Sequence, residues 1–165
     1  MSINDKTLGI KNLKEEKFVI FTIEKRNYGL DIKNVNQVLG YMDIEKFPDL
    51  PDIPDYFEGV LNFENKVLPV IDIRKKFTNN LNQEKKGSYI IASQINNKKV
   101  GIIVDSITEV LCLTKNDIKP ANDVNSIFDN KSIKGVSDKN NEINILIDIE
   151  KVLNEKDYKL IDKFN

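Results

Sequence analysis

The side chains that could perform catalysis or bind a metal ion are few in this chain of 165 residues. The chain has no histidine, so it lacks the commonest general base and the commonest metal ligand of proteins. Its single cysteine, Cys112, excludes an internal disulfide and any metal site built from several thiolates. We find no glycine-rich phosphate loop and no HExxH, CxxC or GxSxG motif. These features favour a binding protein over an enzyme, and we expect no catalytic residue, cofactor or metal.

Two aspartates in similar surroundings are the most obvious candidates for a pair of catalytic carboxylates. Asp72 lies in VIDIRKKF (70–77) and Asp148 lies in LIDIEKVL (146–153), 76 residues later. Because both follow the same apolar pattern, we interpret each as a capping residue for the turn after a strand. The lysine pairs at 85–86 and 98–99 lie on predicted loops without the interleaved aromatic residues of a nucleic-acid track, so we interpret them as solvated surface.

Composition and charge are those of an ordinary soluble globular protein. Hydrophobic residues make up 40% of the chain and charged residues 31%, and the net charge is −1. A net charge so close to zero gives no general attraction to nucleic acid or anionic lipid. No apolar run approaches the ~20 residues that span a bilayer, and the N-terminus shows no apolar signal region. We therefore expect a cytoplasmic protein that does not insert directly into a membrane.

An internal repeat organises the elements that position these residues. Three matches lie 72 residues apart: Gly29 with Gly101, Val35 with Ile107, and Val38 with Val110. The Gly-Val pair at 59–60 recurs 76 residues later at 135–136. Each unit has about five short strands and no long helix, which is typical of small barrels and sandwiches. We predict an all-β fold of two five-stranded barrels packed together, with short helices and a C-terminal helix.

The boundaries of these units follow from the polar segments. The stretch 78–88 has one apolar residue and is the best candidate for a linker. The prediction is therefore a flexible N-terminal tail at 1–16, a first barrel at about 17–80 and a second barrel at about 87–150. A C-terminal helix is predicted at about 151–164, with Asn154 as its N-cap.

The segment 59–77, GVLNFENKVLPVIDIRKKF, predicts a tight β-hairpin, because two apolar runs flank a polar tip at 64–66. Asn65 tolerates the positive φ that closes such a turn. Pro69 has no N–H, so the returning strand cannot be fully paired on both sides.

Four segments, in order, carry a family resemblance that spans nearly the whole chain. They are YGLDIKNVNQVLGY (28–41), GVLNFENKVLPVIDIRKKF (59–77), VGIIVDSITEVLCLTKNDIKP (100–120) and ILIDIEKVLNEKD (145–157). In these segments the chain resembles the CheW family, the coupling proteins of bacterial chemotaxis. The resemblance implies one CheW-like domain at 17–165 built from two five-stranded SH3-like β-barrels, which agrees with the repeat.

The resemblance also implies a function and a set of contact residues. The protein would be a non-catalytic scaffold that joins the cytoplasmic tip of methyl-accepting chemoreceptors to the regulatory domain of the histidine kinase CheA. It would be recruited from the cytoplasm to membrane-bound receptor arrays. Receptor contacts would lie at the groove between the barrels, at the matching positions Val35, Gln37, Val38, Gly59, Asn62, Glu64 and Val110. The alternative for the three valines is packing in the core.

Three positions depart from the family pattern: Gln37, Glu64 and Asn65. Many relatives carry N-x-R-G at the hairpin tip, where this chain has Asn62-Phe63-Glu64-Asn65, and relatives tend to have Glu at the position of Gln37. An acid therefore replaces the arginine and a familiar Glu–Arg pair is absent, which leaves open a specialised paralogue. Three other functions stay open: a CheW-like adaptor for a kinase pathway other than chemotaxis, a small-barrel nucleic-acid-binding module and, as the third, an enzyme.

Overall fold

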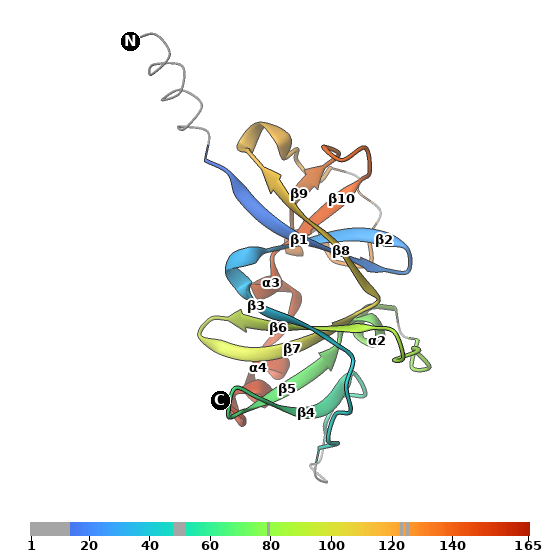
Figure 1. Ribbon diagram of the computed structural model, residues 1–165, viewed down its shortest axis with the longest axis vertical. Coiled ribbons are helices and arrows are strands. Elements are labelled where there is room, and N and C mark those ends of the chain that lie inside the picture. Colours follow the sequence, from blue (N-terminus) through green and yellow to red (C-terminus); the bar gives the residue numbers. More distant parts are fainter. Residues whose placement is uncertain (1–13, 48–51, 79, 123, 125) are drawn as a thin grey trace.

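The computed structural model describes residues 14–47, 52–78, 80–122, 124 and 126–165 (Figure 1). Most of the predicted tail, residues 1–13, lies outside this range, and Glu16 already begins the first strand. The strands are β1 (Glu16–Ile23), β2 (Arg26–Asp31), β3 (Val35–Gly40), β4 (Phe57–Phe63), β5 (Lys66–Asp72), β6 (Tyr89–Ile95), β7 (Lys98–Val104), β8 (Ser106–Leu113), β9 (Ile133–Ser137) and β10 (Asn144–Ile147). The helices are α2 (Ile73–Thr78), α3 (Ile149–Val152) and α4 (Glu155–Asp162), with 3-10 turns η1 (Ile32–Asn34), η2 (Lys115–Asp117) and η3 (Asn130–Ser132).

The strands form two five-stranded sheets, which lie one above the other in Figure 1. One sheet has the order β8-β1-β2-β10-β9, and we call it barrel A. The other has the order β3-β6-β7-β5-β4, and we call it barrel B. Neighbouring strands are antiparallel except for β2 with β10 and β5 with β7, which are parallel. The predicted all-β architecture with short helices is confirmed.

The predicted barrel boundaries, 17–80 and 87–150, are wrong because each barrel takes strands from both halves of the chain. Barrel A joins β1 and β2 to β8, β9 and β10, whereas barrel B joins β3, β4 and β5 to β6 and β7. The repeat makes β1–β5 equivalent to β6–β10. When the strands are numbered from one to five within each repeat, both barrels have the order 3-1-2-5-4, and each barrel mixes strands of the two repeats. The physical reason lies in the links between strands. Only Asp105 separates β7 from β8, which is too short for a hairpin, so β8 continues into the other sheet.

Each barrel closes where the chain that leaves one edge strand reaches the opposite edge strand. In barrel B, Glu45 follows β3 and pairs with Val60 of β4 through N···O distances of 3.0 and 2.7 Å. In barrel A, Lys119 follows β8 and pairs with Val136 of β9 at 2.8 and 2.9 Å. These bridges satisfy backbone groups that would otherwise lie on open sheet edges.

The predicted hairpin is confirmed as β4 and β5 joined by a two-residue turn. Glu64 and Asn65 have φ values of 50° and 62°, between the paired Phe63 and Lys66. Positive φ at both central residues is the conformation that follows the twist of the flanking strands. Pairing of β5 with β7 begins at Val70, so Pro69 lies just outside the part of β5 with two neighbours.

Capping residues end the strands as the sequence predicts. The Asp72 carboxylate accepts a hydrogen bond from Arg74 N at 3.0 Å, and the Asp148 carboxylate accepts one from Glu150 N at 3.2 Å. The predicted C-terminal helix is shorter than expected and is divided into α3 and α4. Asn154 caps α4, since its side chain accepts a hydrogen bond from Asp157 N at 2.9 Å.

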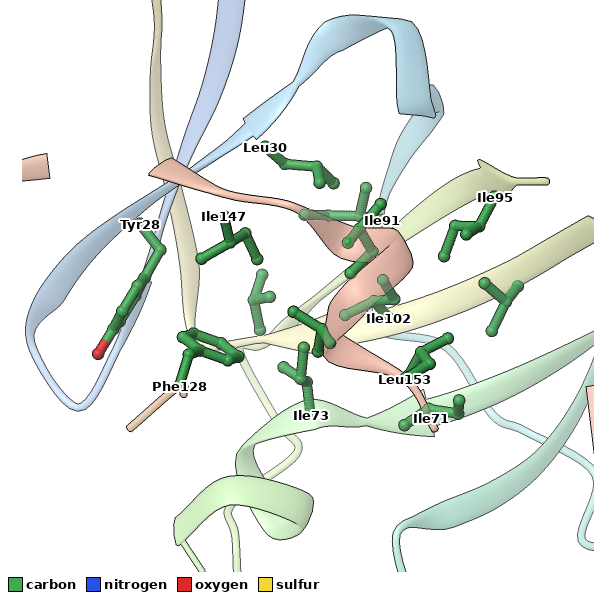
Figure 2. Close-up of a cluster of buried hydrophobic side chains, with 14 of the residues drawn as sticks. Tyr28, Leu30, Ile71, Ile73, Ile91, Ile95, Ile102, Phe128, Ile147 and Leu153 are labelled. Atoms are coloured by element: carbon green, nitrogen blue, oxygen red, sulfur yellow. The ribbon is translucent and has the colours of Figure 1, made fainter. Parts of the chain in front are cut away.

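Hydrophobic side chains form a core within each barrel and a larger core shared by both. The shared core contains residues of β2 and β10 in barrel A and of β5, β6 and β7 in barrel B, together with α3 and α4. Figure 2 labels ten of its members: Tyr28, Leu30, Ile71, Ile73, Ile91, Ile95, Ile102, Phe128, Ile147 and Leu153. Separating the barrels would expose this apolar surface to water, so the two barrels form one unit.

Candidate partner-binding surface

The three predicted valines lie on β3 and β8, which are edge strands of different barrels. Each strand begins directly after a point where the chain passes from one barrel to the other. Val35 follows η1, which leaves β2 of barrel A, and Ser106 follows Asp105, which leaves β7 of barrel B. The geometry of these two crossings therefore sets how β3 and β8 are presented.

Both edge strands carry a β-bulge at the same repeat position. Register shifts leave Asn36 of β3 and Thr108 of β8 without an opposite residue, and these positions are 72 apart. Thr108 Oγ1 donates to Ile20 O at 3.2 Å, which holds the bulge of β8 against β1. Bulges redirect the side chains that follow them. The bulges thus decide which side chains of β3 and β8 point outward.

Burial separates the roles of the valines. Val35 and its repeat equivalent Ile107 are half-buried and pack against the shared core. Val38 is half-buried, whereas Val110 is 52% exposed and Gln37 is exposed. The alternative of core packing therefore applies to Val35 but not to Val110. Gln37, Val38 and Val110 remain available to a partner.

The hairpin residues also divide into structural and accessible ones. Gly59 is buried under the bridge that closes barrel B, with φ at +148°. A Cβ at this position would lie 2.0 Å from the backbone oxygen of Glu45. Gly59 therefore permits closure of the barrel and offers no side chain to a partner, so the structure does not support it as a contact residue. Asn62 and Glu64 are exposed.

Glu64 at the turn has a cationic neighbour in its own chain. Its carboxylate lies 3.8 Å from Lys99 Nζ, and the Glu64 side chain is 61% exposed. An ion pair this exposed adds little to stability, but it reduces the negative charge that the hairpin presents. Beside the pair is a hollow of about 390 Å³, whose lining includes Phe63, Val67 and Phe164.

The structure brings the predicted residues into three places. Val35, Gln37 and Val38 share β3, while Gly59, Asn62 and Glu64 belong to the β4–β5 hairpin at the opposite edge of barrel B. The segment that closes barrel B, 41–45, connects these two groups. Val110 lies on the other barrel, on the strand equivalent to β3.

Sequence reasoning missed a buried arginine next to the barrel crossing. Arg74 is 2% exposed, and its guanidinium donates to both carboxylate oxygens of Asp72, at 3.0 and 2.9 Å. It also donates to Asp105 Oδ1 and to Glu84 O, both at 2.9 Å. Burial alone would lower the pKa of Arg74, but the hydrogen bonds to Asp72 and Asp105 outweigh it and raise that pKa. The sequence signal that could have identified Arg74 is a difference between the repeats, because the equivalent residue in the second repeat is Glu150.

A second buried charge anchors α4. Asp157 is 0% exposed and accepts hydrogen bonds from Tyr56 Oη at 2.5 Å and from Lys76 Nζ. Burial raises the pKa of Tyr56, and the hydrogen bond to Asp157 raises it further. Lys76 belongs to α2, which directly follows β5 of barrel B. This cluster therefore connects the C-terminal helix α4 to barrel B.

The described part of the chain holds no cluster of three or more His, Cys, Asp or Glu side chains suited to a metal ion. A search of the same residues finds no helix with the length and apolar character needed to cross a membrane.

Comparison with known proteins places this arrangement in a family. A family model described as the CheW-like domain matches residues 17–157. The chain belongs to the CheW family. It is 31% identical over 147 residues to the chemotaxis protein CheW of Klebsiella aerogenes, covering 89% of this chain and 87% of that protein. The chemotaxis protein CheW of Thermotoga maritima is 29% identical over 143 residues, covering 87% and 91%.

A solved structure supports the same fold. The scaffolding protein TtCheW from Thermoanaerobacter tengcongensis matches with a TM-score of 0.72 and 31% identity, over 86% of this chain and 89% of that chain. The SH3-like double-barrel fold implied by the four sequence segments is therefore confirmed.

Proposed function

We propose that this protein is a coupling scaffold of bacterial chemotaxis that binds a chemoreceptor tip and the histidine kinase CheA at the same time. The observation that carries the proposal is the CheW-family match, which extends over residues 17–157 and therefore includes both barrels. Curated relatives are named chemotaxis proteins, and one similar structure is named a scaffolding protein. The scaffold acts by holding its partners together and catalyses no reaction. It works in the cytoplasm, at receptor arrays on the membrane.

The accessible residues of the edge strands suit a helical receptor segment. Val38 and Val110 are equivalent residues of the two repeats, and each follows a bulge on an edge strand. A half-buried valine on one barrel and an exposed valine on the other can together accept the apolar face of an amphipathic helix. Gln37, Asn62 and Glu64 are polar residues that select among partners at the border of such a contact. Val35 supports this surface from the shared core.

The hairpin tip adapts this protein to a particular partner. Because Glu64 replaces the arginine common in relatives, the local charge is acidic, and Lys99 at 3.8 Å offsets part of it. A basic or neutral partner surface fits this tip better than an acidic one, since like charges facing each other are unfavourable. An adaptor for a kinase pathway other than chemotaxis is the second candidate, and the departures at Gln37 and Glu64 are what favour it.

A reconstitution experiment tests the proposal. Membranes that contain a chemoreceptor from the same organism are mixed with its CheA, with and without this protein. Attractant should control kinase activity only when the protein is present. Equal control without it, or with heat-denatured protein, would contradict the proposal. Control of a different receptor-linked kinase, with none of CheA, would support the second candidate.

A further inference from the structure

The chain passes from a strand of one barrel to a strand of the other at two short crossings, and the two crossings differ in the charged residues around them. The first crossing is η1, between β2 of barrel A and β3 of barrel B. The second is the single residue Asp105, between β7 of barrel B and β8 of barrel A. Since β3 and β8 start at these crossings, any change in the crossing geometry moves one edge strand relative to the other.

Asp105 is bonded to both barrels. Its backbone N donates to Thr22 O at 3.0 Å, and its Oδ2 accepts from Glu24 N at 2.7 Å, which are contacts with the β1–β2 hairpin of barrel A. Its Oδ1 accepts from Arg74 Nη1 at 2.9 Å, and Arg74 is the second residue of helix α2, which directly follows β5 of barrel B. The two oxygens of one carboxylate thus connect the two barrels.

Arg74 is held rigidly enough to act as the fixed side of this connection. Its Nε and Nη2 bind the two oxygens of Asp72, which is 0% exposed. A planar guanidinium paired in this fork-like way has little freedom to turn. The remaining nitrogen, Nη1, therefore presents its hydrogens toward Asp105 and Glu84 O in a set direction.

The first crossing lacks such a clamp in the described residues around it. Asp31 Oδ1 accepts a hydrogen bond from Lys33 N at 2.9 Å, within the crossing itself. The cation near Asp31 is Lys134, at 3.7 Å with a side chain 39% exposed. The repeat equivalent of Arg74 is the exposed acid Glu150. The buried ionic clamp is thus a feature of the second crossing.

We infer that Arg74 is a positioning residue for partner binding, because through Asp105 it sets where β8 and Val110 lie relative to β3. The inference rests on the proposed function, in which Val38 and Val110 contact one partner from two barrels. A change at Arg74 or Asp105 alters the spacing of these contacts even though neither residue is one of the proposed contact residues.

Pulsed electron paramagnetic resonance tests the inference on the full chain. Spin labels are attached at Gln37→Cys on β3 and Glu109→Cys on β8, both exposed positions, in a Cys112→Ser background. Asp105→Ala is the main variant because the Asp105 side chain is 33% exposed, so its loss is compatible with folding. Arg74→Lys is the second variant, since a lysine keeps the charge but cannot replace the fork. Both should broaden or shift the distance distribution between the labels.

Lys75→Met is the matched control. Lys75 is the next residue of α2, and its ion pair with Glu58 at 2.5 Å stays within barrel B. This variant should lower the melting temperature but leave the distance distribution unchanged. The unlabelled Asp105→Ala and Arg74→Lys proteins should bind a receptor-tip fragment about 2- to 30-fold more weakly, the range typical of coupling through a positioned element.

The outcomes separate the two proposals. Distance distributions of Asp105→Ala and Arg74→Lys that match the parent would overturn the positioning role, whatever their melting temperatures. An equal change of the distance distribution in Lys75→Met would also overturn the positioning role. The change would then reflect a loss of stability in general and not the loss of the contact between Arg74 and Asp105. The distance measurement needs no partner, so failure of the parent protein to bind the receptor fragment would count against the proposed function alone.

Discussion

Val35 and Val110 each have an equivalent residue in the other repeat and lie on edge strands. Their burial differs, so we expect different effects on stability when each is substituted. Val35 packs against the shared core, so Val35→Asp should destabilise the protein by about 1–3 kcal/mol through an unpaired carboxylate. Val110 is 52% exposed, so Val110→Asp should change the free energy of unfolding by less than about 0.5 kcal/mol. Urea unfolding of both variants measures this difference. Equal destabilisation by the two substitutions would mean that Val110 is a core residue and would remove it from the proposed binding surface.

Glu64 gives a second prediction at the residue scale. Glu64→Arg should leave the melting temperature almost unmoved, because the turn is exposed and the lost contact with Lys99 is weak. It should weaken binding to the protein's own partner by roughly 1 kcal/mol, and the loss should shrink at high salt. Titrations at two salt concentrations measure both effects, with Glu64→Gln as the control for loss of the charge alone. Unchanged affinity of Glu64→Arg for every partner would show that this position does not select partners.

Residues that act locally were predictable from the sequence, whereas residues that act across the fold were not. Asp72 and Asp148 bind backbone groups two residues further on, and their sequence context alone indicated this capping role. Gly59 looked like a contact because of its family position, but its space is filled by Glu45 from another segment. Arg74 finds Asp105 31 residues away, and no local pattern encodes that pairing.

At the scale of elements, the closure of each barrel depends on a glycine that lies beneath the closing bridge: Gly59 beneath Glu45 in barrel B, and Gly135 beneath Lys119 in barrel A. Gly59→Ala should destabilise the protein by about 1–3 kcal/mol, since φ is +148° and the added Cβ would meet Glu45 O. Gly40→Ala is the matched control, because a Cβ there meets no atom within 4 Å. Thermal melts compare the two. A Gly59→Ala protein as stable as Gly40→Ala would show that the bridge between Glu45 and Val60 shifts without cost.

Helix α4 gives a pH-dependent prediction. Tyr158 Oη donates to Glu150 O at 2.6 Å, and burial, together with the charge of Glu150, raises the pKa of Tyr158 to about 12 from 10.0. Between these values the unfolded chain loses the proton while the folded protein keeps it, so this group lowers stability as pH rises from 10 to 12. Urea unfolding at pH 8 and pH 11 should show a smaller decrease for Tyr158→Phe than for the parent. Identical decreases would contradict this role of Tyr158.

The elements themselves were more predictable than their assembly. The hairpin, its turn and the interruption at Pro69 followed from residue types whose backbone preferences are local. The bulges at Asn36 and Thr108 were not predicted, because a bulge is defined by the partner strand. The two bulges lie at equivalent positions of the two repeats. The repeats therefore share the register of strand pairing, which cannot be read from the sequence of one strand alone.

At the scale of the whole molecule, the repeat correctly indicated two similar barrels but could not indicate which strands share a barrel. Equivalent strands of the two halves have nearly the same apolar pattern, so a pairing within one half and a pairing between halves satisfy that pattern equally. The short crossings decide between them, since one residue between β7 and β8 prevents a reversal of the chain. The result is a molecule in which neither half contains all strands of either sheet.

This exchange predicts that the two halves cannot fold separately. Fragments 1–82 and 83–165 should each lack cooperative unfolding, because each would leave incomplete sheets and expose its part of the shared core. Mixing the fragments should restore the β-sheet circular dichroism and a cooperative transition, since all pairing edges are then present. A full-length protein cleaved between Asn82 and Gln83 after folding is the control and should stay folded. A cooperative transition in fragment 1–82 alone would show that β1–β5 can close into a barrel of their own, and the exchanged arrangement would then be only one of two accessible folds.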